Sequence, residues 1–469
     1  MKTRKLILAG LFGVLAAATA GAQTPTVIYI SGAPAARTPF STAVYNTLLA
    51  GVSSTGGTIT YAFSGTLGKT TLTNANALAF FGGHLTVNGS NVPITVEVSY
   101  VGSSAGIQAI ADQQPVQFLP TTATNSHTTT AYPEPNGNSN PANYQSVVPQ
   151  FTISDEFQKS TPWLGKNTLN TNFAGSQTYQ TLHSDIVGIL PYEFVTNVDA
   201  PAAINNITPN QARILFETGL IPLSQLTGNH ADENGYLYAV GRDIGSGLRT
   251  VFLSESGIGV QTGLIQYAPV TGTNVGTYTT NTGTQVSGTY TYVTSQGVYP
   301  NEVVNGVPLN NGDGGYGSFT PLQTVLASYS NSNGASIQTD GTAGWYVTPL
   351  AYSDARTAQA AGSHEVAWNG VFLTGSAGGT LPAGGGASTN LAEGSYTFWS
   401  YLNLQYLSST WSSNKAAANF EAAVGNDLIT TDATVLLKNV NVSRQATDGD
   451  GAALYNYPYS TTSISIPYP

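Results

Sequence analysis

Residues 98–110 (VSYVGSSAGIQAI) hold the features that decide the fold of this chain. Leading into them, apolar and polar residues alternate along residues 94–100, which predicts a β-strand. The alternation breaks at Gly102, and apolar residues resume at helical spacing with Ile107 and Ile110. Strand, tight turn and helix in this order are typical of a parallel sheet, whose strands need crossover connections. The stretch therefore predicts an α/β fold.

Two further stretches repeat the order of strand, glycine-rich turn and helix. The first turn lies at residues 32–36 (GAPAA) and the other at residues 241–247 (GRDIGSG). A helix N-terminus presents unpaired amides and a partial positive charge, and glycine lets the backbone approach a ligand closely. Three such turns in one chain favour an anion site built largely from backbone amides.

These segments together resemble the periplasmic phosphate-binding protein of the phosphate ABC transporter, in the type 2 periplasmic binding protein superfamily. The resemblance runs from about residue 27 to residue 442, in an ordered series: the serine turn at 102–106, FTISD at 151–155, the strand at 188–197, the helix from 207 to LTG at 226–228, RDIGSG at 242–247 and GSYTFW at 394–399. It implies an α/β fold of two lobes that close on a ligand like a flytrap, with a β-rich insertion added in this chain.

The resemblance also assigns ligand-binding residues, taken position by position. They are Ala36, Ser103, Asp155, Arg242, Ser246 and Gly247. The planar fork of Arg242 suits a tetrahedral oxyanion. Asp155 would accept the O–H of monoprotonated phosphate, which fully ionised sulfate lacks. The family implies an exported solute-binding protein that delivers phosphate or a related oxyanion to an ABC permease, with no enzymatic activity, cofactor or metal.

Three positions depart from the family pattern. Ala36 stands where a hydroxyl residue is usual, Leu248 where threonine is expected, and Ile244 where an aspartate is common. Each missing donor costs about 1–3 kcal/mol if its partner stays buried and unsatisfied. Arg37 or Arg249 could compensate, but we expect both to be solvated surface arginines.

The chain divides into five predicted parts. They are a cleaved signal peptide at 1–22, lobe 1 at 24–190 with an insertion loop at 112–148, lobe 2 at 195–390 with a Tyr/Thr/Gly-rich insertion at 265–320, a return to lobe 1 at 395–445, and a C-terminal tail at 446–469. We expect the lobes to be joined near residues 190–197 and 385–395. Locally, residues 185–196 predict a buried strand, Thr208 predicts a helix N-cap, and residues 398–407 predict a helix.

Composition limits location and partners. Lys2, Arg4 and Lys5 precede an apolar stretch at residues 6–18, which predicts export. The chain has no cysteine, so we expect neither a lipid anchor nor thiolate metal ligands, and a periplasmic or secreted protein that is not embedded in the membrane. Its net charge of −10 argues against nucleic acid as a partner.

Two other functions fit parts of the sequence. Residues 102–106 match the nucleophile elbow of a serine hydrolase, with Ser104 as nucleophile, but this hypothesis leaves the Asp155 and Arg242 segments unexplained. A charged fraction of only 8% and the missing donors suit an extracellular structural or surface protein whose ligand site has decayed. Residues 311–313 and 448–450 hint at calcium turns, although ordinary β-turns explain them better.

Overall fold

The computed structural model describes residues 23–52, 57–64, 75–119, 144–166, 178–279, 285–304, 307–330, 343–445 and 449–468. The predicted signal peptide and residues 120–143 of the first insertion lie outside this part. Among the described helices, none is both long and apolar enough to cross a membrane.

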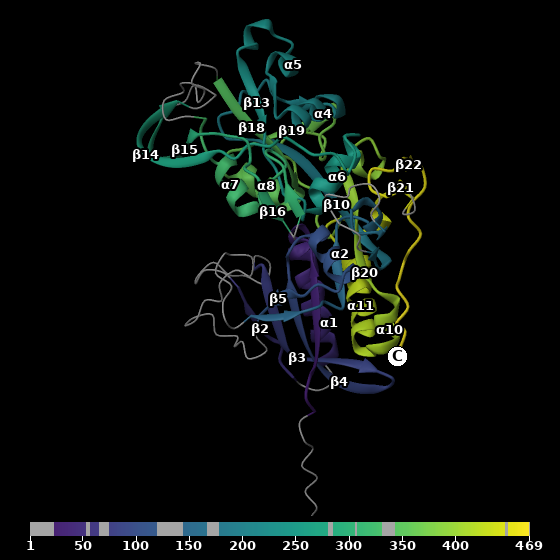
Figure 1. Cartoon of the computed structure of the whole chain (residues 1–469). Coiled ribbons are helices and arrows are strands. Elements are labelled where there is room, and N and C mark those ends of the chain that lie inside the picture. Colours follow the sequence, from purple (N-terminus) through teal and green to yellow (C-terminus); the bar gives the residue numbers. More distant parts are fainter. Residues whose placement is uncertain are drawn as a thin grey trace, which may run out of the picture.

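Two lobes share one mixed sheet of 12 strands (Figure 1). The strands of lobe 1 are β1 (Thr26–Gly32), β2 (Thr60–Phe63), β3 (Ala77–Val87), β4 (Ser90–Ser99), β7 (Phe151–Ser154) and β20 (Trp399–Tyr406). Those of lobe 2 are β11 (Asn206–Ile207), β12 (Leu220–Pro222), β13 (Gly235–Ala239), β18 (Ala343–Ala351) and β19 (His364–Trp368). The strand order is β12-β13-β18-β10-β20-β7-β1-β4-β3-β2, and β19 and β11 continue from β10 off this path. The parallel pairing of β1 with β4 confirms the predicted parallel arrangement.

Strand β10 (His183–Thr196) belongs to both lobes. Its first part pairs with β20 as far as Pro191, and its last part pairs with β18 from Tyr192 onward. The chain therefore crosses between the lobes at Pro191 and Tyr192. All residues of β10 after Asp185 are buried, which explains the continuous apolar run that predicted a strand here.

Helices cover the sheet in both lobes (Figure 1). The helices of lobe 1 are α1 (Arg37–Val52), α2 (Ser103–Ala111), α10 (Ser408–Ser413) and α11 (Lys415–Asp427). The helices of lobe 2 are α4 (Pro209–Thr218), α5 (Ser224–Thr227), α6 (Gly247–Glu255), α7 (Phe319–Leu326), α8 (Tyr352–Ala360) and α9 (Thr389–Ala392). Helix α4 begins as predicted: Thr208 accepts a bond from the Gln211 amide, and the Gln211 side chain accepts one from the Thr208 amide. The α/β class and the two-lobed architecture are confirmed.

The prediction of a helix at residues 398–407 is wrong, because this segment forms strand β20. Every residue of β20 is buried, and the strand pairs antiparallel with both β10 and β7. A strand covered on both faces loses the alternation of apolar and polar residues. Its apolar and aromatic run therefore cannot be distinguished from a buried helix by periodicity.

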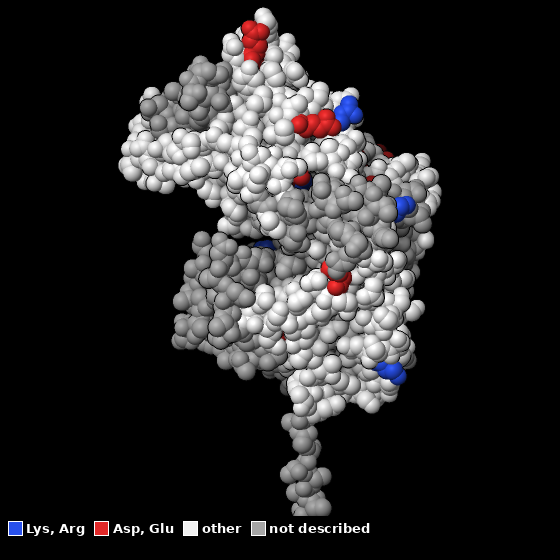
Figure 2. All heavy atoms as spheres, viewed as in Figure 1, with Lys and Arg blue, Asp and Glu red and all other residues white. Residues whose placement is uncertain are grey.

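The second insertion forms the predicted β-ribbon on lobe 2. Strands β14 (Val270–Thr279) and β15 (Gln285–Ser295) pair antiparallel along their length, and the ribbon projects from the lobe (Figure 1). The face shown in Figure 2 displays few acidic or basic side chains and a hollow between the lobes.

Candidate functional site

The three glycine turns meet where the two lobes face each other. The Gly102 amide donates to the Gly32 carbonyl at 3.0 Å, which joins the first two turns within lobe 1. The Ala105 amide donates to the Gly245 carbonyl of lobe 2 at 3.4 Å. A Cβ atom added at Gly102 would overlap that carbonyl oxygen and lie 3.1 Å from its carbon. Glycine at position 102 therefore permits direct backbone contact between the lobes.

Ser103, Asp155 and Gly247 are in mutual contact at this point. The Ser103 hydroxyl donates to Asp155 Oδ1, and the Asp155 amide donates to Ser103 Oγ at 3.2 Å. A Cβ atom added at Gly247 would lie 2.7 Å from Ser103 Cβ and closer still to Asp155 Oδ1. The Ser103 and Asp155 residues are only 1% and 2% exposed. Three residues predicted on separate segments thus form one buried cluster.

Asp155 lies between the starts of two helices from opposite lobes. Ser103 is the first residue of α2 and Gly247 is the first residue of α6. Amides at the first positions of a helix have no carbonyl of their own helix to bond, and the helix dipole makes this end partly positive. Ser246 is the N-cap of α6, is 4% exposed, and makes no capping bond with its side chain. The starts of two helices from opposite lobes therefore face one buried carboxyl group, that of Asp155.

Arg242 supplies positive charge to the same region. Its Nε donates to the Tyr316 carbonyl and its Nη2 to the Gly317 carbonyl, both at 2.9 Å, and the residue is 7% exposed. Arg242 lies on the same turn as Gly247, which contacts Asp155. Burial raises the pKa of Asp155, and the charge of Arg242 acts in the opposite direction. An arginine carries five N–H donors, so two carbonyl bonds do not exhaust its capacity.

Ala36 is the remaining predicted residue. It is fully buried in a 3-10 helix, Pro34–Ala36, that precedes α1. Within the described part of the chain, no hydrogen bond joins it to the other five residues. Its role at the site stays a prediction.

Two further acidic side chains, Glu156 and Asp450, interact electrostatically with Asp155. Burial raises the pKa of Glu156 well above its ordinary value, and the negative charge of Asp155 adds to this effect. The hydrogen bond that Ser104 donates to Glu156 acts in the opposite direction. Burial raises the pKa of Asp450 to about 7, while its carboxylate accepts a bond from the Phe157 amide at 2.8 Å. Burial also raises the pKa of Asp155. Burial therefore disfavours the ionised form of all three acids.

The sequence analysis missed two residues of this region, Glu156 and Asp450. Glu156 follows Asp155 directly, and a pair of adjacent acids was the available signal. Asp450 had been explained as a β-turn residue, and nothing in the sequence links it to Phe157.

The prediction that Arg249 is a solvated surface residue is wrong. Arg249 is 6% exposed, forms an ion pair with the Asp313 carboxylate, and donates to the Asp313 carbonyl at 2.7 Å. The Asp313 side chain also accepts a bond from the Leu264 amide at 2.9 Å. Arg249 is thus held by an internal acid and does not replace the missing donors.

The arrangement around Ser104 differs from a hydrolase active site. Its hydroxyl donates to the Glu156 carboxyl, and the residue is 1% exposed. A nucleophile elbow instead presents an exposed serine oxygen to a histidine base. Among the described residues, the hydrogen-bond partner of the Ser104 hydroxyl is Glu156 and not a histidine.

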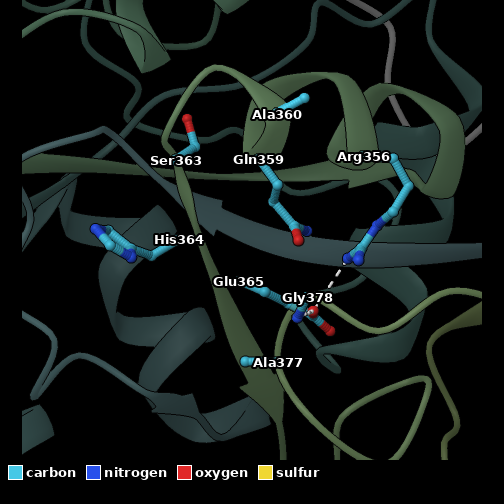
Figure 3. Close-up of a pocket in the computed structure, with 8 residues that line it drawn as sticks. All are labelled: Arg356, Gln359, Ala360, Ser363, His364, Glu365, Ala377 and Gly378. Atoms are coloured by element: carbon cyan, nitrogen blue, oxygen red, sulfur yellow. Dashed lines mark hydrogen bonds and ion pairs between the residues drawn. The ribbon is translucent and has the colours of Figure 1, made fainter.

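A cavity of about 440 Å³ lies elsewhere, within lobe 2 (Figure 3). Its lining mixes polar and apolar residues and comprises Arg356, Gln359, Ala360, Ser363, His364, Glu365, Ala377 and Gly378. Figure 3 shows Arg356 and Gln359 pointing toward Glu365 and Gly378. Arg356 pairs with Glu365 at 3.0 Å and with the buried Glu193 at 2.5 Å, and burial raises the Glu193 pKa to about 8. The Arg356 guanidinium is already taken up by two carboxyl groups, which disfavours an oxyanion here.

No family model and no curated protein matches this chain. Comparison with solved structures does give matches. The chain resembles solved phosphate-binding proteins. One is PfluDING, a high-affinity periplasmic phosphate-binding protein bound with phosphate, at 13% identity over 87% of this chain and 90% of that one, with a TM-score of 0.36.

Two further matches are of the same kind. PstS from Borrelia burgdorferi is 11% identical over 86% of this chain and 96% of its own, with a TM-score of 0.32. The phosphate-binding protein from Stenotrophomonas maltophilia is 14% identical over 85% and 84%, with a TM-score of 0.30. At such low identities and TM-scores these matches do not indicate which ligand this chain binds. The choice of ligand depends on the chain's own residues.

Proposed function

We propose that this chain is a solute-binding protein that takes phosphate or a related oxyanion between its lobes and delivers it to an ABC transporter. The observation that carries the proposal is the position of Asp155 between the first residues of α2 and α6, which come from opposite lobes, with Arg242 on the same turn as Gly247. Helix N-termini and a buried arginine together form a site for an anion.

Asp155 gives the proposed site its selectivity. An ionised carboxylate accepts hydrogen bonds only, so it can bind the O–H of monoprotonated phosphate. Fully ionised sulfate has no proton to donate and would face Asp155 as an unpaired like charge. Since donors come from both lobes, binding would favour the closed arrangement over an open one.

One observation favours the alternative of a structural or surface protein with a decayed site. The polar groups of the site already satisfy one another: Asp155 accepts a bond from Ser103, and Arg242 donates to the carbonyls of Tyr316 and Gly317. A ligand must exchange some of these internal bonds for its own. If it gains less than it displaces, the fold remains and binding is lost.

Calorimetric titration separates the two functions. The protein from residue 23 onward is unfolded and refolded to remove carried ligand, then titrated with phosphate. Because hydrogen bonds to charged groups contribute about 1.5–3 kcal/mol, Arg242→Ala should weaken phosphate binding by about 10- to 150-fold.

The matched control is Arg213→Ala, which removes an exposed arginine of α4 that bonds Asn210. It should bind phosphate like the unmodified protein. Absence of heat with phosphate in the unmodified protein would favour the structural role. Equal losses in both variants would mean that general charge, and not Arg242, governs binding.

A further inference from the structure

The second insertion carries a hairpin that reaches lobe 1. The hairpin pairs β16 (Glu302–Val304) with β17 (Val307–Leu309), and β16 lies on the side of lobe 2 that faces lobe 1 (Figure 1). Leu309 ends β17 and is 5% exposed. Within the described part of the chain, it belongs to a cluster of buried apolar side chains whose other members all come from lobe 1: Ile107, Ile110, Ala111, Trp163, Tyr179, Leu182 and Leu407. Leu309 therefore packs across the boundary between the lobes.

Ile244 makes a second apolar contact of this kind. It is partly buried and packs against the same cluster from the turn that carries Arg242 and Gly247. The neighbouring Asp243 turns its carboxylate back on the turn, where the carboxylate accepts a bond from the Gly245 amide at 3.0 Å. Position 244, where the family commonly has an aspartate, thus holds an apolar residue that contacts lobe 1.

The apolar cluster and the candidate site share helix α2. Ser103 begins this helix at the site, and Ile107 and Ile110 follow four and seven positions later. Residues at these spacings lie on one face of a helix, and each turn rises about 5.4 Å. The apolar contact therefore begins about one helical turn from the Ser103 hydroxyl.

Helix α6 joins the two apolar side chains of lobe 2 to the site. The turn that holds Ile244 leads directly into α6, whose first residue is Gly247. Four positions after Leu309, Asp313 forms an ion pair with Arg249 of α6, and its carbonyl accepts a bond from Arg249 at 2.7 Å. Leu309, Ile244 and Gly247 are thus held on one part of lobe 2 and approach lobe 1 together.

We infer that Leu309 and Ile244 are positioning residues that stabilise the closed arrangement of the lobes through an apolar contact in which the ligand takes no part. This role rests on the proposed function, because it concerns the closure of the same site. Apolar burial is non-directional and does not distinguish one anion from another. The contact determines how strongly any oxyanion is held, whereas Asp155 determines which oxyanion is preferred.

Calorimetric titration of Leu309→Ala and Val303→Ala with phosphate and with sulfate tests this role. Val303 lies on the other strand of the same hairpin and is 68% exposed, so Val303→Ala is the matched control. Leu309→Ala should weaken both anions by about 10- to 100-fold and leave the ratio of their affinities unchanged. Val303→Ala should bind both anions like the unmodified protein. An unchanged affinity or a changed ratio in Leu309→Ala, or an equal loss in Val303→Ala, would overturn the inference.

A cross-linking rate tests the apolar contact without any ligand, and so separates its failure from that of the proposed function. The Ala105 amide meets the Gly245 carbonyl at 3.4 Å between the lobes, and the chain has no cysteine of its own. In the double variant Ala105→Cys with Gly245→Cys, oxidised glutathione at a fixed excess should form a disulfide at a rate that follows the closed fraction. Adding Leu309→Ala should slow this rate about 10-fold, and adding Val303→Ala should not, even if neither anion binds. An unchanged rate with Leu309→Ala would contradict the inference.

Thermal unfolding of the ligand-free protein distinguishes closure from a structural role within lobe 2. A lower melting temperature of Leu309→Ala with unchanged anion affinity would assign Leu309 to the core of its own lobe and overturn the inference. If Leu309→Ala does not fold, Ile244→Ala removes the other side chain that lobe 2 contributes. It should weaken phosphate and sulfate by the same factor and slow the cross-linking, and no change in either measurement would overturn the inference.

Discussion

Gly247→Ala tests whether the lobes close at the candidate site. A Cβ atom at this position would lie 2.7 Å from Ser103 Cβ and overlap Asp155 Oδ1, so lobe 1 and lobe 2 could not approach as closely. The φ angle of Gly247 lies outside the left-handed region, so alanine adds a contact across the lobes and no backbone strain. Overpacking of this kind costs about 1–3 kcal/mol, which corresponds to a loss of phosphate affinity of about 5- to 150-fold.

The assay pairs phosphate titration with thermal unfolding. On the proposed function the lobes are open when no ligand is bound. The substitution should then weaken phosphate binding and leave the melting temperature of the ligand-free protein close to that of the unmodified protein. Gly276→Ala on the exposed ribbon is the control, because nothing lies within 4 Å of its added Cβ atom. Unchanged phosphate binding in a folded Gly247→Ala protein would refute the idea that α6 meets Ser103 and Asp155 in the bound state.

Three further predictions concern stability. The Glu97 carboxyl is buried, and burial raises its pKa to about 8. The folded state therefore binds more protons than the unfolded state between about pH 4.5 and pH 8. The free energy of unfolding should fall as the pH rises through this range. Glu97→Gln should remove this fall, which is worth about 3 kcal/mol at pH 7, in urea unfolding at several pH values. Arg249→Ala should cost about 3–5 kcal/mol because it leaves Asp313 buried and unpaired, and the double variant with Asp313→Ala should recover part of the loss in the same assay. Thr208→Ala should lower stability by about 0.5–2 kcal/mol through loss of the cap on α4, whereas Thr208→Ser should not.

The sequence predicted the parts of the fold whose signals are local. Each unit of strand, glycine turn and helix occupies one short stretch of sequence. The helix cap Thr208 and its partner Gln211 also lie within four positions of each other. Strand β20 was missed because its residues are covered on both faces. Such a strand reveals itself only through its neighbours β10 and β7, which are distant in sequence.

The site required more than local pattern. Ser103 and Asp155 are 52 positions apart, and only the resemblance to a known family joined them before the structure did. The burial of Arg249 depends on Asp313, 64 positions away.

The most direct test of the proposed site is the ratio of phosphate to sulfate affinity in Asp155→Asn, measured by calorimetry at neutral pH. If Asp155 accepts the phosphate proton, the unmodified protein binds phosphate more tightly than sulfate. The amide variant, which has no charge to repel sulfate, should then lose most of that preference. An unchanged ratio, or no binding of either anion by the unmodified protein, would contradict the assignment of Asp155 and its neighbours as a phosphate site.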